Sequence, residues 1–267
     1  MYHDRTKKIL VILFFAVLGL LADRISVAAL WGAKGQTFTL LQLLAPAVGA
    51  FLGGVSGVMT VALTEITSFL IQGKEMTAMN LMRLLPLLFA TLYFAAITRS
   101  RTQSSASESH TGDMLGAFPR EPIFVPFPPS RIGFWKMVEI GVPVLAMIVF
   151  WAHPSGRQAW YFPLYWTIPM IVASTPLKKF LLAKSLGATF TAHAVGGAYW
   201  IWATNMSATL WTALIPVVAI ERGAFAIGIA VTYMAVNSLL AALPAFQALP
   251  VILNNKYRFL SRASRNV

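Results

Sequence analysis

The chain has 267 residues, of which 57% are hydrophobic and only 11% are charged. A soluble domain carries about 25% charged residues, and a soluble chain this apolar would expose large hydrophobic patches and aggregate. Apolar runs close to 20 residues long recur along the sequence, and about 20 residues is the length that a helix needs to cross about 30 Å of hydrocarbon. The composition therefore excludes an ordinary soluble protein and predicts an all-α fold, a polytopic bundle of transmembrane helices.

The formal net charge is +12, with 21 Lys and Arg against nine Asp and Glu. The basic residues stand in short clusters between apolar runs, which is typical of charges that orient a protein in a membrane and not of a nucleic-acid interface. We expect an inner or plasma membrane protein with both termini cytoplasmic and no nucleic-acid partner, because that orientation places five clusters inside. These clusters are Arg5/Lys7/Lys8, Arg99/Arg101, Arg131/Lys136, Lys178/Lys179/Lys184 and Lys256/Arg258/Arg262/Arg265.

About eight spans are predicted from the apolar runs. In chain order they cover residues 9–31, 38–54, 57–72, 78–98, 136–153, 160–177, 182–203 and 223–243. The apolar stretch at 208–220 is short for a crossing and contains Pro216, so we expect a short interfacial or re-entrant helix there, with nine spans as the competing count.

One long loop divides the chain into two parts. Residues 1–98 form an N-terminal four-span half, and residues 136–267 form a C-terminal four-span half that ends in a basic cytoplasmic tail. The intervening segment 99–135 begins with a small, polar, Ser-rich part that cannot bury a core, and continues with a Pro-rich part that favours an extended conformation. We expect this loop to be cytoplasmic.

Four charged residues fall inside predicted spans. Asp23, Arg24, Glu65 and Arg83 would all lie roughly 8–12 Å below the outer surface, at about 1.5 Å of helix rise per residue. Because a charge in the hydrocarbon is costly, we expect these residues to pair or to line a watered cavity. They either pin helices together as fixed ion pairs or leave spare charge for a ligand.

Histidine and aromatic residues supply further candidate ligand contacts. His193 lies near the middle of its span, where it either bonds to a neighbouring helix or contacts a ligand. Trp160, Tyr165 and Trp200 belong to an aromatic group concentrated near the predicted outer face, and Trp166 is expected with them in the wall of a ligand cavity. This group is either an interfacial belt or a surface on which a flat organic ligand stacks.

Small residues recur every four positions in the second predicted span. Ala45, Gly49 and Gly53 share one helix face, so that another helix can approach closely. This face either packs inside the chain or docks a partner membrane subunit.

Catalytic and metal-binding motifs were sought along the chain and none was found. There is no HExxH, GxSxG or phosphate-binding glycine loop, no cysteine, and no second histidine at the depth of His193. We therefore expect no enzyme activity, no metal site and no cofactor.

Residues 37–57 (TFTLLQLLAPAVGAFLGGVSG), followed by a span that carries Glu65, resemble the substrate-binding S components of energy-coupling factor (ECF) transporters. The resemblance covers residues 9–98. It implies a core like that of the six-span S components, a pocket that opens outward, and delivery of the substrate by toppling against a membrane scaffold subunit driven by ATPases.

The favoured function is therefore that of an integral membrane protein, surrounded by membrane lipid, that takes part in the uptake of a small molecule. Its ligand cavity should open to the outer face, between the N-terminal hairpin of helices and the spans that carry Trp166 and His193. One alternative is a scaffold or assembly subunit of a larger membrane complex. A second alternative is a membrane enzyme that acts on a lipid-linked substrate.

Overall fold

The structure is a computed structural model that describes residues 2–29, 37–73, 75, 77–99, 131–247 and 249–258. The predicted Ser-rich and Pro-rich loop at 99–135 therefore lies almost entirely outside the described residues, and so does the end of the basic tail after residue 258. The helices and the one pair of strands described below belong to these ranges.

The N-terminal half contains five helices and a short strand pair. Its elements are α1 (Tyr2–Ala22), β1 (Ser26–Ala29), β2 (Thr37–Thr39), α2 (Leu41–Leu52), α3 (Gly54–Ile71), α4 (Ala78–Met82) and α5 (Leu85–Arg99). The two strands pair antiparallel, with Ser26 opposite Thr39 and Ala29 opposite Thr37.

The C-terminal half is helical throughout its described length. Its elements are α7 (Arg131–Lys136), η2 (Met137–Gly141), α8 (Val142–Ala152), α9 (Pro154–Gln158), η3 (Phe162–Trp166), α10 (Thr167–Ser174), η4 (Pro176–Lys179), α11 (Leu181–Ala203), α12 (Ala208–Ala213), α13 (Ile215–Ala242), α14 (Pro244–Gln247) and η5 (Asn255–Tyr257).

Four helical stretches of the described chain are long and apolar enough to cross a membrane, at 54–71, 78–98, 133–152 and 215–242. The chain is thus a helical membrane protein, as its composition predicts. Helix α11 has 23 residues and a length of about 35 Å. Helix α2 has only 12 residues, which is too short to cross the hydrocarbon alone. The structure does not by itself fix the number of crossings at eight.

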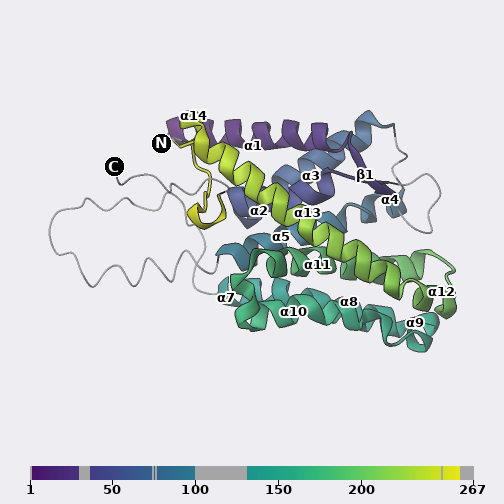
Figure 1. Ribbon diagram of the computed structural model, residues 1–267. Coiled ribbons are helices and arrows are strands. Elements are labelled where there is room, and N and C mark those ends of the chain that lie inside the picture. The colour runs from purple at the N-terminus through teal and green to yellow at the C-terminus, as the bar shows by residue number, and fades with distance from the viewer. Residues whose placement is uncertain are drawn as a thin grey trace.

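The two ends of the bundle differ in what they carry. Figure 1 shows the start of α1, helix α14 and helix α7 at one end, which we call the terminal end. The strand pair, α4, α9 and α12 lie at the other end, which we call the hairpin end. This arrangement follows from helices that run alternately in opposite directions.

The first predicted span, 9–31, is wrong in its second half. Helix α1 ends at Ala22, and the chain then turns into β1. The backbone amide of Leu40 donates to the carbonyl of Ile25 at 2.8 Å, which extends the strand pairing. Because short strands satisfy their backbone groups with each other, this apolar segment needs no helix. Asp23 and Arg24 consequently follow the end of α1 instead of lying inside it.

The expected boundary between an interfacial helix at 208–220 and a span at 223–243 is also wrong. The short helix α12 ends at Ala213, and α13 runs without a break from Ile215 to Ala242. Pro216 occupies the first turn of α13, where a missing backbone N–H costs nothing. Glu221 and Arg222 are therefore helical residues inside a 28-residue helix, which crosses the bundle obliquely in Figure 1.

Proline residues interrupt two of the long helical stretches. Pro86 stands just after the turn at Arg83 and Leu84 that separates α4 from α5. Pro143 follows the π-helical turn η2, which holds the buried Glu139. Because proline cannot donate a backbone hydrogen bond, the chain widens or turns immediately before it.

Aromatic rings tie the two halves into a shared core. Phe51 of α2 stacks on Phe15 of α1, with ring centroids 5.7 Å apart, and on Tyr233 of α13, at 5.1 Å. Phe94 of α5 meets the edge of Tyr233 at 5.6 Å. A second cluster surrounds Phe150 of α8. Helix α11 contributes side chains to both clusters and so lies at the centre of the fold.

We expect Gly49→Ala to destabilise the protein by about 1–3 kcal/mol, because an added Cβ would press on the backbone carbonyl of Thr91 in α5. Gly133→Ala is the matched control, since a Cβ at that helical position meets no atom within 4 Å. Thermal unfolding in detergent measures both variants. Equal stability of the two would contradict the close packing of α2 on α5.

Candidate functional site

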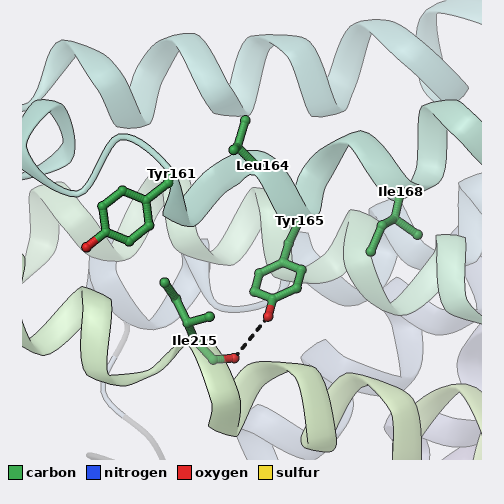
Figure 2. Close-up of a pocket in the computed structure, with 5 residues that line it drawn as sticks. All are labelled: Tyr161, Leu164, Tyr165, Ile168 and Ile215. Carbon is green, nitrogen blue, oxygen red and sulfur yellow. Dashed lines mark hydrogen bonds between the residues drawn. The ribbon is translucent and has the colours of Figure 1, made fainter.

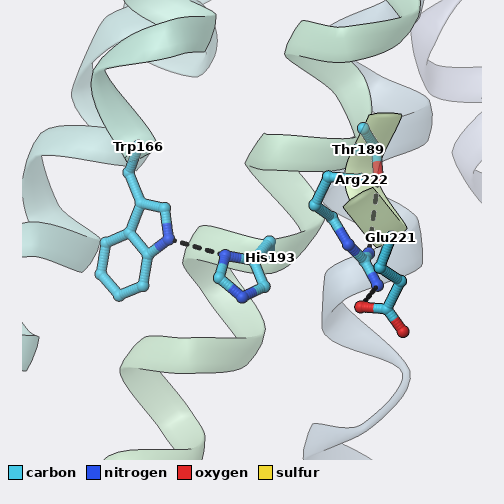
Figure 3. A network of polar contacts seen from close by, with 5 residues as sticks. All are labelled: Trp166, Thr189, His193, Glu221 and Arg222. Atoms are coloured by element: carbon cyan, nitrogen blue, oxygen red, sulfur yellow. Dashed lines mark hydrogen bonds and ion pairs between the residues drawn. The ribbon is translucent and has the colours of Figure 1, made fainter. Parts of the chain in front are cut away.

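A buried tryptophan and a histidine join η3 to α11. Nε1 of Trp166 donates a hydrogen bond to Nδ1 of His193 at 2.9 Å (Figure 3). A nitrogen that accepts a hydrogen bond carries no proton, so the ring in this geometry has its proton on Nε2. The ring of Trp166 also lies on Gly197, where a Cβ would come within 2.6 Å of it. His193 therefore makes the hydrogen bond to a neighbouring helical segment that was one of its two predicted roles.

Arg222 is a buried cation that is not among the residues predicted from the sequence. Its Nη2 pairs with Oε2 of Glu221 at 2.6 Å, and its Nη1 donates to Oγ1 of Thr189 at a longer 3.4 Å. Thr189 lies one helical turn before His193 on α11, so Arg222 and Trp166 reach the same stretch of that helix from two sides (Figure 3).

Two phenylalanine rings contact the Arg222 guanidinium and also meet each other edge to face, with centroids 4.9 Å apart. Its Cζ lies 5.2 Å from the ring centroid of Phe38 on β2 and 4.7 Å from that of Phe225 on α13, both within cation–π range. The side chain is only 8% exposed. Its Nε is buried and has no hydrogen-bond partner within the described residues. One N–H of a buried charged group therefore has no acceptor.

The four predicted intramembrane charges do not form the expected ion pairs. Neither Asp23 nor Glu65 pairs with a basic residue in the part of the chain that is described. Asp23 instead accepts hydrogen bonds from Thr39 at 2.9 Å, from Gln72 at 3.0 Å and from Ser68. These hydrogen bonds connect the end of α1 to β2 and to α3.

Glu65 lies one turn before Ser68 on α3, within electrostatic range of Asp23. Its Oε2 is buried and has no hydrogen-bond partner in the described chain. Two acidic groups close together repel each other when both are charged. Like the Nε of Arg222, the Oε2 of Glu65 is therefore a buried polar atom whose burial no hydrogen bond offsets.

The remaining predicted charges lie near the hairpin end. Arg24 is exposed in the turn after α1. Arg83 ends α4 and places its Cζ 5.1 Å from the ring centroid of Trp200 on α11. The structure thus joins Arg83 to one predicted aromatic residue, through a cation–π contact.

One apolar pocket of about 340 Å³ opens beside η3. Tyr165 lines it together with Tyr161, Leu164, Ile168 and Ile215 (Figure 2). The hydroxyl of Tyr165 donates to the backbone carbonyl of Ile215 at 3.3 Å, so it is already satisfied.

The pocket lies close to the polar cluster on α11. The ring of Tyr165 stacks on Phe190 at 5.4 Å, and Phe190 meets the edge of His193 at 6.1 Å. None of the predicted charged residues lines this pocket. Trp160 is 58% exposed and points away from the core.

The small-residue face of α2 lies inside the chain. Ala45 is fully buried. Gly49 packs on Thr91 of α5, and a Cβ on Gly57 would come within 2.5 Å of the Gly49 Cα. Gly53 has φ +80° and forms the tight turn between α2 and α3. Ala45 and Gly49 therefore serve internal packing, which was the alternative to a partner-docking face.

A metal site would need several ligands close together. Within the described ranges, no group of three or more His, Asp or Glu side chains is arranged to hold a metal ion. A search against models of protein families, curated proteins and solved structures gives no significant match to this chain.

Sequence reasoning missed Arg222, Thr189 and Phe38. Arg222 was predicted to lie just outside a span, because Pro216 and the charged pair Glu221–Arg222 indicated that the helix at 208–220 ends before the span at 223–243 begins. An available signal was the first-turn preference of proline, which allows one continuous helix from Ile215. No sequence signal indicates that Phe38, 184 positions away, reaches Arg222.

We expect Trp166→Phe to lower the free energy of unfolding by about 0.6–1.7 kcal/mol, the range for a hydrogen bond between helices in a membrane. The substitution removes the donor to His193 and also the indole carbons that lie on Gly197, so lost packing adds to this range. Trp160→Phe, at an exposed position, is the matched control and should change little. If thermal unfolding in detergent cannot separate the two variants, the hydrogen bond contributes no stability.

Proposed function

We propose that this protein is a membrane subunit that binds a small molecule for uptake, as the resemblance of residues 9–98 to ECF S components implies. The observation that carries the proposal is the buried Arg222 guanidinium, which lies beside the rings of Phe38 and Phe225 and has an unpartnered Nε. Binding sites combine a few polar groups with an apolar, aromatic wall, and this cluster has that composition.

The cost of burying Arg222 supports a functional role. A charged residue inside a transmembrane helix costs about 2.5–3.5 kcal/mol even on the lower insertion scales. The pair with the adjacent Glu221 offsets part of this cost, but a buried pair is weak evidence for stability. A ligand with a carboxylate or carbonyl oxygen would accept the free N–H of Arg222, beside the edge-to-face pair of Phe38 and Phe225.

The ligand would reach Arg222 from the hairpin end, because Phe38 belongs to β2. Glu65 offers a second buried oxygen without a partner, on α3. We assign Arg222 and Thr189, which bond to each other, as polar contacts, and Trp166 and His193 as the rigid support behind Thr189. Glu65 lies near Asp23 instead and is left outside this pair. No step of this role requires catalysis, a metal or a cofactor.

The orientation follows from the basic residues at the terminal end. Arg5, Lys7 and Lys8 begin α1, and Lys178 and Lys256 lie in η4 and η5. Because cytoplasmic ends carry the excess of Lys and Arg, the terminal end faces the cytoplasm and the hairpin end faces outward. A scaffold subunit and ATPases would then complete an importer from the cytoplasmic side.

A scaffold or assembly role is the alternative function. Its main support was the small-residue face of α2, but Ala45 and Gly49 are used inside the chain. Affinity purification from membranes discriminates the two roles. ATPase subunits in the purified complex would support uptake, whereas a biosynthetic or respiratory complex would overturn it in favour of a scaffold.

We expect a cysteine placed at Gln158 to react with a membrane-impermeant maleimide in intact cells. A cysteine at Asn255 should react only after the cells are permeabilised. Both positions are exposed, Gln158 in α9 and Asn255 in η5, and the chain has no cysteine of its own, so the parent is an unlabelled control. The opposite labelling pattern would reverse the orientation.

We expect the purified protein to retain a small molecule that mass spectrometry detects, and Arg222→Gln to reduce its retention by about tenfold or more, equivalent to about 1.4 kcal/mol. Arg157→Gln, which removes an exposed arginine of α9, is the matched control.

Thermal unfolding establishes that the Arg222→Gln variant is folded. Equal retention by a folded Arg222→Gln protein and by the control would remove Arg222 from the site. The absence of any retained molecule from the wild-type protein, under conditions that keep it folded, would count against the uptake role.

A further inference from the structure

Basic side chains from three separate segments of the chain gather at the terminal end of the bundle. Lys178 and Lys179 come from η4, Lys256 and Arg258 from η5 and the residue after it, and Lys136 from the end of α7. The four lysines are exposed. We call these five residues the basic cluster.

The fold fixes two of these segments against each other. Tyr257 is buried, and its hydroxyl donates to the backbone carbonyl of Lys179 at 3.2 Å. This bond joins η5 to η4, which lies 78 residues earlier in the chain. The segments that carry Lys179, Lys256 and Arg258 are therefore joined by a specific contact and do not merely occupy the same end of the bundle.

Asn237 of α13 holds the segment around η5 in place. Its side-chain amide donates to the carbonyls of Asn254 and Tyr257, both at 2.8 Å, and accepts from the backbone N–H of Asn254 at 2.9 Å. All of these contacts use an amide side chain that is fully buried. A segment without long helices is thereby held in one conformation, which presents its basic residues in a fixed arrangement.

In the described part of the chain, Glu139 offsets part of the positive charge of the cluster. Glu139, in the π-helical turn η2, is within electrostatic range of Lys136 and Lys178. Its carboxyl is buried. It forms no ion pair within the described ranges, where the salt bridge joins Glu221 to Arg222. The Nε of Arg258 is buried without a hydrogen-bond partner in the described chain. Among the described residues, the cluster thus has excess positive charge, carried by four exposed lysines and by Arg258.

Exposed apolar side chains border the basic residues. Leu177 and Phe180 flank the two lysines of η4, and Nζ of Lys179 lies 5.1 Å from the ring centroid of Phe180. Lysines with apolar neighbours keep their stems in hydrocarbon and extend their ammonium groups to the polar boundary. Lipid phosphates lie at that boundary, whereas a soluble anion would not need the apolar border.

We propose that the basic cluster binds the phosphate of an anionic phospholipid, with Lys179, Lys256 and Arg258 as the main contacts. Basic pockets beside transmembrane helices at the cytoplasmic side are suited to such head groups. The lipid would join η4 to η5 from outside, next to the contact that Tyr257 and Lys179 make inside. This site is distinct from the Arg222 site and does not depend on the proposed uptake function.

The test compares lipid retention by the full-length protein in detergent, measured by native mass spectrometry. Phosphatidylglycerol should be retained preferentially over zwitterionic phosphatidylcholine. The double variant Lys179→Gln/Lys256→Gln should weaken phosphatidylglycerol retention by about fivefold for each base removed. Arg24→Gln/Arg157→Gln, which removes two exposed bases at the hairpin end, is the matched control and should retain the lipid.

Three results would overturn the proposal. Equal retention of the two lipids by the wild-type protein would leave no preference for an anionic head group. An equal loss of phosphatidylglycerol retention in both double variants would show that retention depends on the net charge of the protein and not on the basic cluster. Displacement of the lipid by inorganic phosphate at the same concentration would show a site for a soluble anion. Thermal unfolding confirms that the variants are folded before retention is compared.

Discussion

The close approach of other segments to α11 is the constraint on which the rest of the structure depends. Glycine makes this approach feasible: the ring of Tyr93 lies directly on Gly187, and the ring of Trp166 lies on Gly197. In a membrane, helices associate through such packing because lipid provides no hydrophobic drive between them. Once α5 and η3 lie against α11, its polar residues His193 and Thr189 must find partners inside the bundle. These partners are Trp166 and Arg222.

The same physics separates the two proposed sites. At the first site, the charge of Arg222 is buried beside aromatic rings, where each N–H needs a hydrogen-bond acceptor. The Nε–H has no acceptor in the described chain, and a ligand would supply it. At the terminal end, the lysines are exposed beside apolar side chains, where lipid head groups supply the opposite charge. One site thus depends on desolvation and the other on the membrane boundary. Helix α13 contributes to both, with Arg222 near one end and Asn237 near the other.

Predictions from single runs of residues were reliable when the physical cause was local. Runs of about 20 apolar residues identified the four described stretches that are long enough to cross a membrane, because the thickness of the hydrocarbon fixes their length. The predicted span 160–177 is instead divided among η3, α10 and η4. The small face of Ala45 and Gly49 was found from its four-residue spacing, although its partner, inside the chain, was not. The pairing of Asp23 or Glu65 with Arg83 failed, because depth along a helix does not determine which side chains face each other.

The sequence alone therefore determined an all-α membrane protein with basic clusters between its apolar runs, since composition and run length control partition into lipid. It also selected His193 and Trp166 individually. Only the tertiary structure joined them, ended α1 at Ala22, and extended α13 across Glu221 and Arg222. Each of these outcomes depends on contacts between distant segments, such as the pairing of β1 with β2 and the contact of Phe38 with Arg222. Local pattern carries no information about such contacts, because they arise from how the helices pack.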